Sequence, residues 1–324
     1  LKGGTRLPPA TPHRLYVMDA VFNHLVDSRV NIYDGDSMKF LGMVPASFNG
    51  HMTVSADGKD IYVMTTYYER LNRGKRTDVV EAWDAETLTP KYEVPIPQKR
   101  AQALNYRNYL QQSTDGALLF VQNATPASSV TVVNLQTRQF ADEVTAAAGC
   151  WSIIVLPSRP RSFASICGDG ALLTVDLDPA GKPAGQQRSQ PMFDPEKDPI
   201  FTHTENLGDT YYFVSYNGNV YSADFSGKEA AFGKPWSLLD AAGKDQAGAL
   251  AATTCWPSTR PPSGCMWACI PTGPKVRTRR RPPRSGSTTW PRTSGWRGCR
   301  ARMPCRCRFR RTTSRVCTRS TAAT

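Results

Sequence analysis

The cysteines and histidines of this chain could bind a metal, and the cysteines could also form disulfides. The sequence has nine cysteines and four histidines, and seven of the cysteines lie in residues 246–324. The histidines are scattered along the first part of the chain: His13, His24, His51 and His203. None has a second histidine at ligand spacing or a cluster of cysteines and carboxylates beside it, so we expect no metal site there.

The tail, residues 246–324, differs in composition from residues 1–245. It contains sixteen Arg, one Lys and no acidic residue, whereas residues 1–245 carry 23 basic and 27 acidic side chains. The net charge of +13 is therefore −4 for the first part and +17 for the tail. The tail also has only four Leu, Ile or Val residues. With so few aliphatic side chains we expect it to be irregular or disordered.

Three explanations of the tail are open. Basic runs at 279–281 and 306–311 would suit nucleic-acid binding, since Arg neutralises phosphate and Trp stacks on bases. Zinc binding is a second explanation, but Cys265-x3-Cys269 and Cys305-x-Cys307 lack the paired spacing of a ribbon or finger. A shifted frame in GC-rich DNA would also give a segment rich in Arg, Pro, Cys and Trp. We favour the frame shift, and expect neither a native second domain nor nucleic-acid binding.

Residues 1–245 repeat one pattern. A polar turn, often Asp-Gly, opens one β-rich run, and a later β-rich run ends at an Asp or Asn. The last residues of five such closing runs are spaced by 50, 50, 42 and 48: the runs are 30–34, 79–84, 130–134, 172–176 and 220–224. This spacing predicts an all-β fold with about five recognisable β-propeller blades. No apolar run is long enough to cross a membrane, so we expect no membrane insertion.

Several segments of residues 1–245 resemble one family. RLNRGKRTDVVEAWD at 70–84 is similar to an early blade of the heavy subunit of quinoprotein amine dehydrogenases, the tryptophan tryptophylquinone enzymes. CWSII at 150–154 and SICGDG at 165–170 resemble a disulfide hairpin of that family. MVPASFNG at 43–50 and NVYSADF at 219–225 resemble the aromatic amine dehydrogenase branch rather than the methylamine branch. The resemblance covers residues from about 14 to about 245.

The resemblance implies a seven-bladed β-propeller in a periplasmic assembly of two heavy and two light chains. In that family the light subunit carries the tryptophan tryptophylquinone and the catalytic residues, so we expect no cofactor and no catalytic residue on this chain. The enzyme oxidises primary amines to aldehydes and ammonia and passes electrons to a blue-copper protein. The heavy subunit docks the light subunit and helps to shape the substrate channel.

Few residues can be assigned a role from the resemblance. Phe48 matches the aromatic residue that lines the channel, although a lone Phe can equally be packed between blades. Cys150 and Cys167 match the disulfide, with two buried free thiols as the alternative. The basic strip Arg70, Arg73, Lys75 and Arg76 is either a contact for the light subunit or a solvated loop that Asp78 and Glu81 balance.

Other functions remain open from the sequence. The chain could be a free-standing β-propeller that binds a ligand or a protein, or the heavy subunit of a methylamine dehydrogenase. A nucleic-acid-binding tail would conflict with the periplasmic location that the resemblance implies. The sequence starts at Leu1 and shows no export signal, so we expect that any such signal has been removed or was not included.

Overall fold

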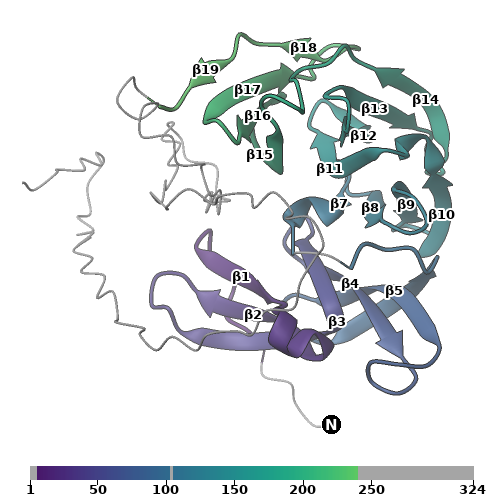
Figure 1. Ribbon diagram of the computed structural model, residues 1–324. Coiled ribbons are helices and arrows are strands. Elements are labelled where there is room, and N and C mark those ends of the chain that lie inside the picture. The colour runs from purple at the N-terminus through teal and green to yellow at the C-terminus, as the bar shows by residue number, and fades with distance from the viewer. Residues whose placement is uncertain (1–5, 103–104, 240–324) are drawn as a thin grey trace, which may run out of the picture. The chain divides into compact units, whose positions relative to one another are not determined.

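The structure, a computed structural model, describes residues 6–102 and 105–239 (Figure 1). These residues belong to one compact unit, Leu1–Val276, and the second unit, Arg277–Thr324, lies outside them. The predictions about the tail at 246–324 therefore also lie outside the described residues. The described elements are strands and three short 3₁₀ helices: η1 (Phe22–Asp27), η2 (Arg107–Tyr109) and η3 (Thr145–Ala147). The expected all-β fold is confirmed for this part of the chain.

The first sheet follows the chain order through six antiparallel strands: β1 (Arg14–Asp19), β2 (Ser28–Asp34), β3 (Phe40–Val54), β4 (Asp60–Tyr68), β5 (Arg76–Asp84) and β6 (Pro90–Ile96). The long strand β3 changes partner part-way. Its residues from 40 to 47 pair with β2, and those from 48 to 54 pair with β4. Strand β3 therefore ends one three-stranded group and begins a four-stranded one.

Three more antiparallel sheets follow. The second contains β7 (Leu110–Gln112), β8 (Leu118–Asn123), β9 (Ser129–Asn134) and β10 (Gln139–Val144). The third contains β11 (Cys150–Leu156), β12 (Arg159–Cys167), β13 (Leu172–Leu177) and β14 (Pro183–Arg188). The fourth contains β15 (Ile200–Leu207), β16 (Thr210–Ser215), β17 (Asn219–Asp224), β18 (Ala231–Phe232) and β19 (Trp236–Ser237). The five predicted closing runs are confirmed as β2, β5, β9, β13 and β17.

The acidic or amide residue that ends most of these runs makes the following turn. The side chains of Asp34, Asp84 and Asn134 each accept hydrogen bonds from two backbone N–H groups, two and three residues later. Asp224 accepts one from Ser226. Such Asx turns end a strand because the side chain accepts hydrogen bonds from the following backbone N–H groups, which then do not pair with a neighbouring strand. The repeated Asp or Asn in the sequence therefore marks a repeated turn.

Neighbouring sheets share their cores. Strand β8 is buried on both faces: Leu119 and Val121 pack with Met64 of β4, whereas Phe120 packs with Phe163 of β12. The same arrangement joins the third and fourth sheets through Ile154 and the ring of Phe213. A sheet that buries both faces against its neighbours is typical of β-propeller blades.

The number of blades is not determined by the described residues. They form four to five sheet units, depending on whether the six-stranded first sheet is counted as one unit or as two units joined by β3, and no sheet among them closes on itself. The seven-bladed ring thus stays a prediction. Among the described residues, no helix has the length and apolar character needed to cross a membrane.

Candidate functional site

Phe48 lies at the point where β3 leaves one partner strand for the next. Its neighbours Ser47 and Asn49 have positive φ angles of 46° and 47°, so the backbone turns sharply around it. The half-buried Phe48 ring meets Tyr68 of β4 edge to face, with ring centroids 5.3 Å apart. The expected channel role of Phe48 is not tested by this geometry, but its ring is partly accessible.

Strand register aligns polar side chains beside Phe48. Phe48 pairs with Thr66 of β4, Thr66 pairs with Asp78 of β5, and the Thr66 hydroxyl donates to the Asp78 carboxylate over 2.7 Å. Arg76 binds the same carboxylate through Nε at 2.7 Å and Nη2 at 2.5 Å. The Asp78 side chain is fully buried and that of Arg76 is 23% exposed, so this ion pair is largely removed from water.

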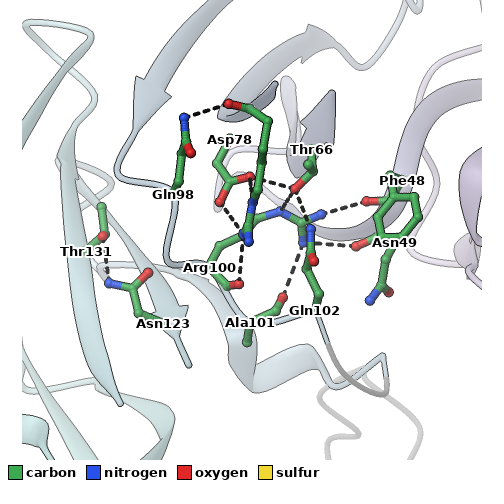
Figure 2. A network of polar contacts seen from close by, with 11 residues as sticks. Phe48, Asn49, Thr66, Asp78, Gln98, Arg100, Ala101, Gln102, Asn123 and Thr131 are labelled. Atoms are coloured by element: carbon green, nitrogen blue, oxygen red, sulfur yellow. Dashed lines mark hydrogen bonds and ion pairs between the residues drawn. The ribbon is translucent and has the colours of Figure 1, made fainter. Parts of the chain in front are cut away.

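Arg100 connects this row to the backbone around Phe48 (Figure 2). Its Nη2 donates to the Phe48 carbonyl over 2.6 Å, and its Nη1 donates to the Asn49 carbonyl over 3.0 Å. Its Nε donates to the Thr66 hydroxyl over 2.7 Å. Burial lowers the pKa of Arg100 to about 10, and the Asp78 charge partly opposes this shift. The guanidinium is therefore still protonated at neutral pH.

Sheet topology explains why these residues meet. Consecutive antiparallel strands alternate in direction, so the second part of β3 starts at the end of the sheet where β4 turns into β5 and where β6 finishes. Phe48, the β4–β5 loop at 69–75 and Arg100, which follows β6, therefore share one end of the sheet. We call this the crossover end, because the chain passes from β6 to the next sheet there.

The β4–β5 loop is exposed and basic. Arg70, Arg73 and Lys75 are exposed, and Leu71 between them is 70% exposed with a φ of 63°. The expected balance by Asp78 is confirmed for Arg76, but the prediction is wrong for the exposed tip of this loop. Asp78 binds Arg76, while Glu81 is buried and accepts hydrogen bonds from the Tyr67 hydroxyl and the Trp83 indole at its own strand face.

A group of aromatic residues gathers around η2, and no sequence pattern singles it out. Tyr109 contacts both Tyr106 and Trp151 edge to face, with centroids 5.3 Å apart in each pair, and accepts a hydrogen bond from the Trp151 indole. Tyr106 contacts the His203 ring at 4.4 Å. Arg107 forms a 2.7 Å ion pair with Glu205 of β15. Apart from the Tyr106–Tyr109 pair, these contacts join residues 42 to 98 positions apart, which local sequence patterns do not reveal.

His203 gives this group a pH dependence. Burial, and secondarily the Arg107 charge, hold the pKa of His203 below its ordinary value of 6.5. As the pH falls below 6.5, the unfolded chain takes up a proton that folded His203 resists, so the free energy of unfolding decreases until the folded pKa is passed. We expect His203→Phe to remove this part of the decrease between about pH 7.5 and about pH 5. Urea unfolding of both proteins across that range checks it, and an unchanged pH dependence would contradict it.

Cys150 and Cys167 form a disulfide between β11 and β12. The two residues are directly paired in the sheet, and both are at most 2% exposed. Arg188 of β14 lies beside the bond, with Nη1 3.3 Å from the Cys167 sulfur and Nη2 2.7 Å from an oxygen of Asp169. The structure thus contains the bond that the resemblance implied.

The disulfide is expected to stabilise its sheet. Replacing both Cys150 and Cys167 with alanine should lower the free energy of unfolding by about 3 kcal/mol, because the unfolded chain loses a closed loop of 17 residues. Urea unfolding followed by tryptophan fluorescence measures the loss. Reduction of the unmutated protein should give a similar decrease, and a loss below about 1 kcal/mol in both cases would contradict this account.

The described residues contain no group of three or more His, Cys, Asp and Glu side chains placed to hold a metal ion. Two of the histidines instead contact single carboxylates: His13 lies 2.7 Å from Asp36, and His24 lies 3.2 Å from Asp19.

The crossover end combines the partly accessible aromatic ring of Phe48, the buried cation of Arg100 and the exposed basic β4–β5 loop. Such a surface can dock a partner and guide a small organic molecule.

Comparison with known proteins identifies the family. A family model described as methylamine dehydrogenase heavy chain (MADH) matches residues 11–251. The chain belongs to the methylamine dehydrogenase heavy chain family. The heavy chain of Methylophilus methylotrophus is 30% identical over 70% of this chain and 55% of its own length. That of Methylobacillus flagellatus is 29% identical over 73% and 58%.

This heavy-chain family member spans a little over half the length of the curated relatives that it matches. Among solved structures, the dihydro-heme d1 dehydrogenase NirN aligns with a TM-score of 0.47 and 19% identity, over 70% of this chain and 45% of that chain. The family assignment is supported by the sequence match. This match supports the assignment of the chain as a heavy subunit of an amine dehydrogenase, and it does not decide between the aromatic and the methylamine branch.

Proposed function

We propose that this chain is the heavy subunit of a periplasmic aromatic amine dehydrogenase. The family match over residues 11–251 carries the heavy-subunit part of the proposal, and Phe48 lies partly accessible at the crossover end within the matched residues. The segments at 43–50 and 219–225 support the aromatic branch. The second candidate is a methylamine dehydrogenase heavy subunit, which the similarity to methylamine dehydrogenase heavy chains favours.

The proposed reaction converts a primary amine and water into an aldehyde and ammonia, with the release of two electrons and two protons. A tryptophan tryptophylquinone on the light subunit would accept the electrons, and a blue-copper protein would take them onward. The catalytic residues would lie on the light subunit. This chain would dock that subunit in an assembly of two heavy and two light chains, with the Phe48 ring lining the amine's passage.

The basic β4–β5 loop supplies a docking surface beside Phe48. Arg70, Arg73 and Lys75 are exposed at the same end of the sheet, and exposed charges of one sign speed the approach of an oppositely charged partner. We expect the triple change R70E/R73E/K75E to slow association with the light subunit by on the order of tenfold. Surface plasmon resonance at low and high salt measures this effect.

Changing exposed charges away from the crossover end provides the control for that experiment. Lys182 and Lys228 follow strands of other sheets and are exposed. K182E/K228E should leave the association rate within about twofold of the parent. Equal rates for the loop variant and the parent at low salt would show that the loop does not face the light subunit.

Co-purification tests the subunit assignment. An affinity-tagged form of this chain, expressed together with a light subunit of this family, should retain a small chain with the visible absorbance of a quinone. Purification of a stable, monomeric chain without such a partner would instead favour a free-standing β-propeller.

We also propose that the tail at 246–324 results from a shift of reading frame. The family match stops at residue 251, close to Asp245, the last acidic residue. Sequencing the coding DNA over codons 240–324 and translating all frames tests this. Another frame should restore acidic residues and alternating β-rich runs, and a confirmed frame without such an alternative would contradict it.

The periplasm is the proposed location. The Cys150–Cys167 disulfide supports it, because buried structural disulfides form in oxidising compartments. A tagged chain should be released with the periplasmic fraction of the cells, and its recovery with the cytosol would oppose the proposal.

A further inference from the structure

Arg100 is a buried cation whose contacts are mainly with neutral oxygen atoms. It is 2% exposed and lies in the crossover segment after β6. Its hydrogen bonds reach the carbonyls of Phe48, Asn49 and Ala101 and the hydroxyl of Thr66. A buried charge is costly unless its donors are satisfied, so the surrounding oxygens must hold their positions around it.

The carbonyls of Phe48 and Asn49 belong to the turn where β3 changes partner. Both Ser47 and Asn49 adopt left-handed backbone angles, which asparagine tolerates but which serine keeps only when its surroundings enforce them. The planar guanidinium of Arg100 can bond two adjacent carbonyls at once, whereas the single ammonium group of a lysine lacks this fixed geometry. Arg100 therefore holds the backbone on both sides of the Asn49 Cα, directly after Phe48.

Thr66 fixes the guanidinium in turn. Its hydroxyl accepts hydrogen bonds from Arg100 Nε and from Gln102 Nε2 at 2.9 Å, and donates to the buried Asp78 carboxylate (Figure 2). Three segments, β4, β5 and the crossover after β6, thus determine where the Phe48 carbonyl lies. The Phe48 ring belongs to the same residue and packs against Tyr68, so the position of the ring depends on where this backbone lies.

We propose that Arg100 is a positioning residue that holds the Phe48 ring in one orientation against Tyr68 and so sets the width of the amine's passage. The restraint on the ring is argued from the backbone contacts of Arg100 and the ring contact with Tyr68. Its effect on the passage rests on the proposed function.

Fluorine NMR tests the positioning directly. 4-Fluorophenylalanine is placed at position 48 of the full chain, and the resonance is compared between the parent and Arg100→Lys. We expect one narrow resonance in the parent and a shifted or broadened one in Arg100→Lys. Arg76→Lys is the matched control: Arg76 belongs to the same network but contacts Asp78 and the Arg100 carbonyl rather than Phe48. Its resonance should match the parent's.

An unchanged resonance in Arg100→Lys would overturn the proposal. If that variant does not fold, Thr66→Val replaces it, because this change removes the acceptor for Arg100 Nε and keeps the charge. Thr66→Val should also broaden or shift the resonance, and an unchanged signal would again overturn the proposal.

Steady-state kinetics of the complex with the light subunit test the effect on the passage. Arg100→Lys should change the ratio of kcat/KM values for a bulky and a small primary amine by on the order of tenfold. In a Phe48→Ala background the same change should have little effect, since Arg100 acts through the ring. An equal change in both backgrounds would overturn the proposed action through Phe48. A complex that oxidises no amine would contradict the proposed function, while the fluorine resonance would still decide the positioning.

Discussion

Replacing Phe163 with alanine is expected to lower the stability of the second and third sheets by about 4 kcal/mol. Phe163 and Phe120 are both fully buried, and their ring centroids lie 5.2 Å apart between β12 and β8. The change removes a large apolar side chain and leaves a cavity that neither sheet can fill without moving. Hydrogen exchange of amides in β8 and β12 measures the free energy of opening.

Phe140→Ala provides the control for this prediction. Phe140 is a residue of β10 in the same pair of sheets, but it is 41% exposed. Its replacement should change the free energy of opening by about 0.5 kcal/mol or less. Similar losses for the two variants would show that the sheets do not share the core described above.

Asp78→Ala is expected to lower the stability of the first sheet by about 3 kcal/mol. Asp78 is the buried carboxylate that binds Arg76, accepts a hydrogen bond from Thr66 and helps to compensate the charge of Arg100. Its loss leaves two cations with less compensation in a region that water reaches poorly. Hydrogen exchange of amides in β4 and β5 gives the change in opening free energy.

Glu86→Ala is the matched control in the same sheet. Glu86 follows β5 and forms an ion pair with Arg6 at 2.9 Å, but the two side chains are 46% and 73% exposed. Its loss should cost about 0.5 kcal/mol or less, as is usual for exposed ion pairs. If Asp78→Ala cost no more than Glu86→Ala, the buried network would not hold the crossover end together.

Local sequence patterns were sufficient to predict the strands that close each repeat. The runs that became β2, β5 and β9 end at Asp34, Asp84 and Asn134, and each of these side chains makes the turn that the pattern indicated. The openings were equally visible: Gly58 and Gly116 follow Asp and have positive φ angles of 71° and 74°. Turn chemistry involves residues a few positions apart, so the sequence shows it directly.

The crossover end could be predicted only in part. Phe48 was singled out by resemblance, but its position at the change of partner in β3 depends on pairing with two different strands. Arg100 lies in the polar segment PQKRAQ, which has the composition of an exposed loop, yet it is buried by contacts with residues 34 to 52 positions away. Burial of this kind arises from tertiary packing, for which the segment itself has no signal.

Amine oxidation by the assembled complex is the most direct test of the central claim. The chain, purified together with its light subunit, is supplied with 2-phenylethylamine or methylamine and an artificial electron acceptor. The account predicts reduction of the acceptor that depends on the amine, with a higher kcat/KM for the aromatic amine. A complex that reduces the acceptor with neither amine would contradict the assignment of this chain to a functioning amine dehydrogenase.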